Sequence, residues 1–498
     1  MTAVTRANDG REVGEQDGAD HPAGQERPRT AAHDHKTPPA LREFLTGGWA
    51  TPAPVPTEPV PALAQHDERR AALSRRFPGL LLVVPSGVER TRANDTEFRF
   101  RAGTDYLYLL GDGEPEEVLV MEPRPDGGHD TRVYAEPEPD WTDLAFFEDR
   151  VKGALWVGPR RGLAATRQRF GLEARPLAEL PQVLGRHDRG AVLRGLDPAV
   201  DRLAADIAGP DAELAAALSE LRLVKDASEI SALEEACDLT TAAFESVVRA
   251  LPHSRSERDV EVAFFATARR QGNDTGYLTI AAAGAHATIL HWSRNDGPLR
   301  PQDLLLLDAG VETRRYYTAD VTRTLPIGGR YSPEQRAVYE IVLAAQRAAL
   351  AQVRPGQRFR APHDAAMVVL AEGLERLGVL RVPAAEALQA DRQLYRRYSL
   401  HGVSHMLGID VHDCSHAAED RYSGAVLEAG MVLTVEPGLY FQPHDLTVPE
   451  PLRGLGVRIE DDVVVTADGC RVLSAALPVD PDAVEAWMGR LWAAGAPG

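Results

Sequence analysis

The sequence predicts an α+β domain over residues 223–498. A smaller α/β domain over 63–222 and an extended or disordered arm over 1–62 precede it. The chain has 498 residues, 44% of them hydrophobic, which is enough for at least two sizeable cores. Helical and strand patterns alternate between roughly 65 and 185, whereas after about 224 two long helical patterns precede a series of strand patterns.

The predicted arm is polar, charged and rich in proline. Its proline-rich part runs from Thr51 to Pro61 and has little periodic apolar content, which is typical of chain that forms no core. The segment from Leu41 to Trp49 could form one short helix. The arm is therefore expected to add little to either core.

The smaller domain opens with a charged helix at His66–Phe77. Apolar runs then predict strands, and a helix at Asp211–Glu220 closes the junction with the next domain. The predicted strands are Gly79–Val84, Tyr106–Leu110 and Val118–Met121.

The larger domain begins with two helices, Ser228–Ala250 and Ser256–Arg270, each expected to be capped by its first serine. Helices also follow at Pro333–Val353 and Ala365–Leu377. The remaining apolar runs predict strands at Tyr277–Ala282, Thr288–Trp292, Leu304–Asp308, Tyr316–Arg323, Met431–Val435, Gly456–Asp461 and Val463–Val465.

Charge and composition exclude several classes of function. Lys and Arg number 55 and Asp and Glu 74, a net charge of −19, which disfavours nucleic acid or an anionic membrane as partner. No run approaches the roughly 18 to 20 apolar residues of a membrane span, and the start lacks the apolar core of a signal peptide. The three cysteines show no paired spacing. A cytoplasmic protein is expected.

Five residues lie at or beside the ends of apolar runs: Asp308, Asp320, His405, Glu436 and Glu460. Taken singly, each has an ordinary explanation as a turn residue, a solvated strand end or a core histidine. If the four carboxylates met in one cleft, their repulsion would require cations, and two divalent ions would offset their charge. Oxygen-rich ligation with one imidazole favours manganese first, with cobalt, iron(II) or zinc as alternatives.

The segment from His401 to His412 strengthens this prediction, because it places three histidines among apolar residues. The motifs Leu-Leu-Leu-Leu-Asp-Ala-Gly, Thr-Ala-Asp-Val-Thr-Arg-Thr, His-Gly-Val-Ser-His-Met-Leu-Gly, Thr-Val-Glu-Pro-Gly and Val-Arg-Ile-Glu-Asp-Asp follow in order. Over residues 65 to 470 the chain thus resembles aminopeptidase P, of the pita-bread dinuclear metallopeptidases. The resemblance implies a C-terminal pita-bread domain after a creatinase- or prolidase-type α/β domain.

The resemblance also implies a role for each residue. Asp308 would hold one ion, His405 and Glu436 the other, and Asp320 and Glu460 would bridge them. Glu436 would also carry protons, and His291 and His412 would contact the substrate and stabilise the tetrahedral intermediate. His401 would relay protons or line the proline pocket, and Arg458 would orient the acidic groups.

The implied activity removes the N-terminal residue from peptides with proline in second place, by attack of a hydroxide activated by two metal ions. A homodimer or homotetramer is implied as well, although Leu107 stands where bacterial relatives often have a tryptophan that reaches the neighbouring subunit. Prolidase, which cleaves only Xaa-Pro dipeptides, is the nearest alternative. Methionine aminopeptidase and creatinase fit less well, and a non-catalytic pita-bread binding module is more remote.

Overall fold

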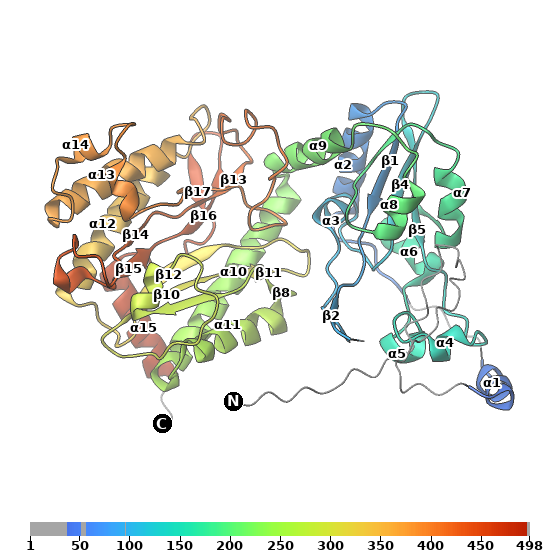
Figure 1. Cartoon of the computed structure of the whole chain (residues 1–498), viewed down its shortest axis with the longest axis horizontal. Helices are drawn as coiled ribbons and strands as arrows, with labels where there is room; N and C mark the ends of the chain where they lie inside the picture. Colours follow the sequence, from blue (N-terminus) through green and yellow to red (C-terminus); the bar gives the residue numbers. More distant parts are fainter. Residues whose placement is uncertain (1–36, 51–55, 95, 496–498) are drawn as a thin grey trace, which may run out of the picture. The chain divides into compact units, whose positions relative to one another are not determined.

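The computed structural model of the chain (Figure 1) describes residues 37–50, 56–94 and 96–495. The predictions made for 1–36 and 51–55 lie outside these residues. The described residues divide into two compact units: those within Met1–Thr51, Thr91–Thr96 and Pro139–Pro159, and those within Pro52–Arg90, Glu97–Glu138 and Arg160–Gly498. The second unit contains the five-stranded sheet of the first predicted domain and the sheets of the second.

The smaller unit is built around a group of aromatic side chains. The ring of Trp141 lies 5.3 Å from that of Trp49 and 4.4 Å from that of Phe146, measured between centroids. A helix lies at the position suggested for Leu41 to Trp49. The elements of this part are α1 (Pro39–Thr46), β2 (Thr91–Ala93), β3 (Thr96–Glu97), α4 (Ala145–Glu148) and α5 (Ala154–Val157).

In the larger unit, the first domain is organised by a five-stranded sheet in the order β6-β5-β4-β1-β7. The strand β1, which pairs with β4 on one side and β7 on the other, is buried along its whole length, as its unbroken apolar run predicts. The strands are β1 (Leu81–Pro85), β4 (Val118–Pro123), β5 (His129–Ala135), β6 (Glu173–Pro176) and β7 (Gly190–Val192). The helices are α2 (Leu63–Arg76), α3 (Thr104–Leu110), α6 (Gly162–Phe170), η1 (Leu177–Glu179), α7 (Leu180–Leu184), α8 (Pro198–Leu203) and α9 (Asp211–Leu223).

The predicted strand at Tyr106–Leu110 is wrong, because these residues belong to the helix α3. The side chains of all five residues are buried. An unbroken apolar run has no periodicity that would distinguish a buried helix from a buried strand. The helix stops at Gly111, whose φ of 80° is a left-handed C-terminal cap. Leu107 is only 2% exposed, so its side chain lies in this chain's own core.

The second domain contains four small sheets, ordered β12-β10-β9, β11-β8, β13-β16-β17 and β14-β15. Its strands are β8 (Asp274–Thr275), β9 (Ile280–Ala283), β10 (Leu304–Ala309), β11 (Val311–Glu312), β12 (Val321–Pro326), β13 (Val432–Val435), β14 (Gly438–Tyr440), β15 (Gly456–Arg458), β16 (Asp461–Val465) and β17 (Cys470–Val472). Its α-helices are α10 (Ala227–Ala250), α11 (Glu257–Gln271), α12 (Pro333–Leu350), α13 (Ala361–Arg376), α14 (Ala384–Ala387) and α15 (Pro481–Gly495). Short 3-10 turns are η2 (Leu251–His253), η3 (Gly284–Thr288), η4 (Leu394–Arg397) and η5 (Glu450–Leu452).

Two details of this domain differ from the sequence-based prediction. The side chain of Asp226, not Ser228, caps α10, whereas Ser256 caps α11 as predicted. The predicted strand Thr288–Trp292 is wrong: Thr288 is the last residue of the turn η3, and the chain continues from it in irregular conformation. Side chains, and not a backbone ladder, hold this segment in place.

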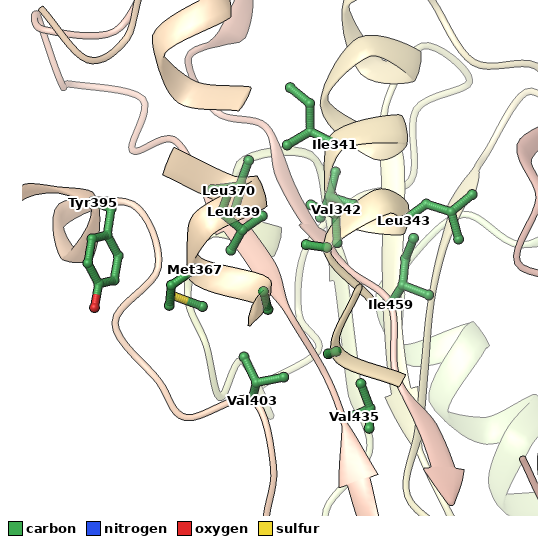
Figure 2. Close-up of a cluster of buried hydrophobic side chains, with 14 of the residues drawn as sticks. Ile341, Val342, Leu343, Met367, Leu370, Tyr395, Val403, Val435, Leu439 and Ile459 are labelled. Atoms are coloured by element: carbon green, nitrogen blue, oxygen red, sulfur yellow. The ribbon is translucent and has the colours of Figure 1, made fainter. Parts of the chain in front are cut away.

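A hydrophobic cluster between α12, α13 and the strand ends supports the candidate ligands (Figure 2). Val342 and Leu370 of these helices belong to the same buried cluster as Val403, Val435 and Ile459. Val435 directly precedes Glu436, and Ile459 directly precedes Glu460. Close packing of the apolar neighbours therefore fixes where these two carboxylates emerge.

Polar contacts link the helices α3 and α9 to the segment around His412. The guanidinium of Arg222, in α9, donates to Asp413 at 2.9 Å and also to Asp105 of α3. Thr104 donates to Asp410 at 2.7 Å. The irregular segment around His412 is thus held by side chains of the first domain. Across the described part of the chain, every helix is too short or too polar to cross a bilayer.

Candidate metal centre

The five predicted ligands meet at the ends of strands from two sheets. Asp308 lies in β10, opposite Thr322 of β12, and Asp320 directly precedes β12. The backbone N–H of Glu436 donates to Val403 at 2.8 Å, and that of Glu460 donates to Thr322 at 3.1 Å. The first bond joins the end of β13 to the segment that carries His405, and the second joins β12 to the turn between β15 and β16.

The ligand atoms are close enough to share cations. Nε2 of His405 lies 3.2 Å from Oδ2 of Asp320 and 3.6 Å from Oε1 of Glu436. Ligand atoms of Asp320, His405 and Glu460 all lie within 4.8 Å of one another. Tyr277 connects Asp308 to this group, because its hydroxyl is 2.6 Å from Oδ1 of Asp308 and also contacts Oδ1 of Asp320.

The acids are crowded and poorly hydrated. Burial raises the pKa of Glu436 to about 7, and the carboxylates of Asp320 and Asp308 add to the rise. Burial, together with the same neighbours and Glu436, raises the pKa of Glu460 well above its ordinary value. Because the site disfavours so many adjacent negative charges, its donor set fits divalent cations.

His405 lies beside two of the acidic ligands, Asp320 and Glu436, and attracts both. Burial opposes a charge on His405, but the bond to Asp320 and the charge of Glu436 outweigh it and raise the pKa of His405 to about 9. Burial likewise opposes ionisation of Asp320, yet its bond to His405 lowers the pKa of that carboxyl overall. A bound cation would replace this proton as the partner of both groups.

Arg458 is buried beside the acids, where it contacts Asp308 directly and Glu460 through Thr322. It donates through Nη2 to Asp308, through Nη1 to the Tyr440 hydroxyl at 2.9 Å and through Nε to Thr322 at 3.2 Å. The Thr322 hydroxyl in turn donates to Glu460 at 2.6 Å. The planar guanidinium therefore orients two ligands from β10 and the β15–β16 turn.

His401 is held as a neutral imidazole. Its Nδ1 lies 2.7 Å from the carbonyl oxygen of Gly402, and its Nε2 lies 2.8 Å from the Tyr440 hydroxyl. Burial, and then the charge of Arg458, lowers the pKa of His401 to about 4. Since a carbonyl can only accept, Nδ1 carries the proton and Nε2 accepts from Tyr440.

His291 and His412 lie on the solvent side of the ligands, and both are exposed. The ring of His412 stands edge-on to that of His405, with centroids 4.4 Å apart. Burial and the charge of His405 lower the pKa of His412, and His291 contributes to the lowering at both His412 and His401. The structure therefore brings all nine candidate residues into one neighbourhood.

Sequence reasoning missed several residues that contact the ligands. Tyr277 and Tyr440 belong to apolar runs, where a tyrosine is usually a core residue, so nothing in the pattern distinguishes them. Asp462 accepts from the backbone N–H of Asp320 at 3.0 Å and from the thiol of Cys237 at 3.3 Å. Only its position two residues after Glu460 could have drawn attention to it.

Comparisons with known proteins agree with this arrangement. Residues 231–467 match the model of metallopeptidase family M24, and residues 66–191 match the aminopeptidase P N-terminal domain. Xaa-Pro aminopeptidase 1 of Streptomyces coelicolor is 51% identical over 457 residues, which cover 91% of this chain and 92% of that protein. The Escherichia coli Xaa-Pro aminopeptidase is 32% identical over 446 residues, 84% of this chain and 96% of its own.

Solved structures give the same result. Aminopeptidase P from Escherichia coli, with the inhibitor Pro-Leu, superposes with a TM-score of 0.79 at 30% identity, covering 87% of this chain and 99% of that one. Proline aminopeptidase P II from Yersinia pestis gives a TM-score of 0.77 at 32% identity, covering 86% and 100%. Both domains of the fold are therefore shared with these proteins.

Proposed function

The chain belongs to the aminopeptidase P branch of metallopeptidase family M24, and from this premise we propose that it removes the N-terminal residue from peptides with proline in second place. The observation that carries the proposal is the convergence of Asp308, Asp320, His405, Glu436 and Glu460, with His291, His401 and His412 beside them. Family M24 also implies divalent metal ions.

We propose that two ions bind, manganese first, with cobalt, iron(II) or zinc able to replace it. Asp308 would hold one, His405 and Glu436 the other, and Asp320 and Glu460 would contribute to both. The ions would supply Lewis acidity that polarises the peptide carbonyl and lowers the pKa of the attacking water. The hard, oxygen-rich donor set supports this choice of metal.

Glu436 is the proposed proton carrier. Its Oε1 faces His405, and its Oε2 lies 3.4 Å from Nδ1 of His401, so the carboxylate is placed between a ligand and a neutral imidazole. It would take the proton of the attacking water and pass it to the leaving proline nitrogen. His401 would keep the carboxylate in place or border the proline ring.

His291 and His412 are proposed to act on the substrate itself. They are exposed beside the buried ligands, where a peptide carbonyl can reach them. An imidazole N–H directed at the carbonyl oxygen would stabilise the charge that develops there. Arg458 would act from behind, by holding Asp308 and the Tyr440 hydroxyl in fixed positions.

We further propose a cytoplasmic enzyme that assembles as a homodimer or homotetramer. The proposed subunit contact does not use the side chain of Leu107, which is buried in its own domain. Sedimentation of the purified protein would measure the subunit number.

The test is hydrolysis by protein stripped of metal and reloaded with manganese, cobalt or zinc. Substrates are Xaa-Pro dipeptides, longer Xaa-Pro-Yaa peptides and matched Xaa-Ala peptides. Cleavage of Xaa-Pro-Yaa peptides, restored by metal and lost in Glu436→Ala, is expected. Cleavage of dipeptides alone would instead identify a prolidase. Absence of stoichiometric metal, with no difference between the native protein and Glu436→Ala, would identify a non-catalytic binding module.

A further inference from the structure

The carboxylate of Glu257 gathers four N–H groups from one irregular segment of the chain. Glu257 is the first residue of α11 and is fully buried. Oε1 accepts from the backbone of Ala283 and from Nδ1 of His286, both at 2.7 Å. Oε2 accepts from the indole N–H of Trp292 at 2.8 Å and from the backbone of Gly297 at 2.7 Å.

These four donors span residues 283–297. Ala283 ends the strand β9, and from Gly284 to Gly297 the turn η3 is the one regular element. Such a segment has few backbone bonds of its own to define its path. The ring of His286 stacks on that of Trp292, with centroids 3.8 Å apart. The carboxylate thus fixes the beginning, the middle and the end of the segment together.

A second buried side chain fastens the same segment to β9. Asn295 is fully buried, with φ 47°, and its side-chain oxygen accepts from the backbone of Ala281 at 3.0 Å. Its side-chain nitrogen donates to the Thr279 carbonyl at 2.9 Å. Side-chain bonds to Glu257 and Asn295 therefore hold the chain in place where the sequence predicts a strand, at Thr288–Trp292.

His291 is the residue directly before Trp292. Its neighbours Leu290 and Trp292 pack against the cluster that includes Tyr440, whose hydroxyl contacts His401. His291 itself is exposed, and no hydrogen bond of its ring is found among the described residues. Its position is therefore set by the segment that carries it.

We propose that Glu257 is a positioning residue for the peptidase reaction, which acts through Trp292 and His286 to place the His291 imidazole at the substrate carbonyl. The inference rests on the role proposed for His291. Glu257 does not touch the substrate. A carboxylate suits the task because both of its oxygens accept, whereas an amide would direct an NH2 group at two of the four donors.

The variants Glu257→Gln, Trp292→Phe and His291→Ala test this proposal in the metal-loaded enzyme with an Xaa-Pro-Yaa peptide. Loss of an oxyanion donor in His291→Ala should lower kcat about a hundredfold or more. Misplacement of the same ring in Glu257→Gln should lower kcat about tenfold to a hundredfold, with KM changed less. Glu257→Asp, which keeps the charge, should recover part of the loss.

The decisive measurement is the double variant Glu257→Gln/His291→Ala. If Glu257 acts through His291, removing it from protein that already lacks the imidazole should change kcat less than about twofold. The control is Phe244→Leu, which destabilises the buried core that includes Phe264 of α11. Its effect on kcat should combine multiplicatively with that of His291→Ala. Independent, multiplicative effects of Glu257→Gln and His291→Ala would overturn the proposal.

Two further readouts separate failure of this inference from failure of the proposed function. The imidazole NMR signals of His291 should shift in Glu257→Gln, whether or not peptides are cleaved, and an unmoved ring would overturn the proposal. A full effect of His291→Ala on kcat with none for Glu257→Gln or Trp292→Phe would overturn it while sparing the proposed function. If His291→Ala is fully active, both the role of His291 and this inference are wrong. Should Glu257→Gln fail to fold, Trp292→Phe, which removes one donor, replaces it in the same cycle.

Discussion

The Tyr440 hydroxyl lies 2.8 Å from Nε2 of His401. It also accepts from Arg458 at 2.9 Å, so its single proton is left to donate to the histidine. The phenol thereby connects the buried guanidinium of Arg458 to the imidazole of His401. Loss of the Tyr440 hydroxyl should therefore affect both Arg458 and His401.

Tyr440→Phe is expected to lower the free energy of unfolding by about 1 to 3 kcal/mol, because a buried donor of Arg458 and the acceptor of His401 lose their partner. Urea unfolding of the metal-loaded protein measures the change. Tyr398→Phe removes a partly buried hydroxyl that bonds Thr447 and serves as the control, with a smaller loss expected. Equal losses in the two variants would contradict the bridging role of Tyr440.

Tyr277→Phe is expected to weaken metal binding about tenfold or more, since its hydroxyl orients one oxygen of Asp308 and one of Asp320. Competition between the protein and a chelator for Mn²⁺ gives the affinity. The matched control is Tyr106→Phe, another buried tyrosine that bonds a carboxylate, Glu117, in the first domain. Metal affinity that is lowered equally in both variants would rule out a specific effect of Tyr277.

Metal binding should release protons near neutral pH. The metal-free protein holds a proton on His405, whose pKa is about 9 because Asp320 and Glu436 outweigh its burial. The imidazole must lose that proton to become a ligand, so the apparent affinity for Mn²⁺ should fall as the pH decreases from 9. Calorimetry at pH 7.5 in two buffers of different ionisation enthalpy counts the protons, and a count of zero would contradict the prediction.

Acid should destabilise the first domain through His66. Burial, and then the charge of Arg69, lowers its pKa from 6.5 to about 4, while its Nδ1 bonds the Tyr108 carbonyl. Between these pH values the unfolded chain binds a proton at His66 that the folded chain excludes. The contribution of neutral His66 to the free energy of unfolding is therefore fully present above pH 6.5 and is lost as the pH falls toward 4. The loss is about 3 kcal/mol.

The check is the free energy of unfolding measured from pH 7 to pH 4. His66→Gln, which cannot titrate, should show a shallower decline across this interval, even if it is less stable at pH 7. Parallel curves for the two proteins would assign the acid sensitivity to other groups.

The sequence was most informative where residues with unusual chemistry follow apolar runs. Asp308, Glu436 and Glu460 could be located because a buried strand with an acid at its end is conspicuous. Their convergence could not be derived from local pattern, since it depends on backbone bonds such as that from Glu460 to Thr322. The family resemblance, and not the local pattern, predicts this convergence.

Local rules failed where long-range contacts decide the conformation. The acidic run 460–462 looks like a solvated strand end, yet all three side chains are buried. Asp461 pairs with Arg323 at 2.7 Å, and Asp462 bonds the backbone of Asp320. Thr288–Trp292 has strand composition, but Glu257, more than thirty residues earlier, determines its path. No window of neighbouring residues contains such information.

The contacts of Arg222 with Asp105 and Asp413 restrict how this protein can be dissected. A truncated chain beginning at α10 would leave the carboxylate of Asp413, fully buried beside the His412 segment, without its cation. The first domain is therefore not an exchangeable module that could be removed or grafted onto another peptidase. Its loss would loosen the segment that carries His412, and calorimetry of the intact chain should record the two domains melting together.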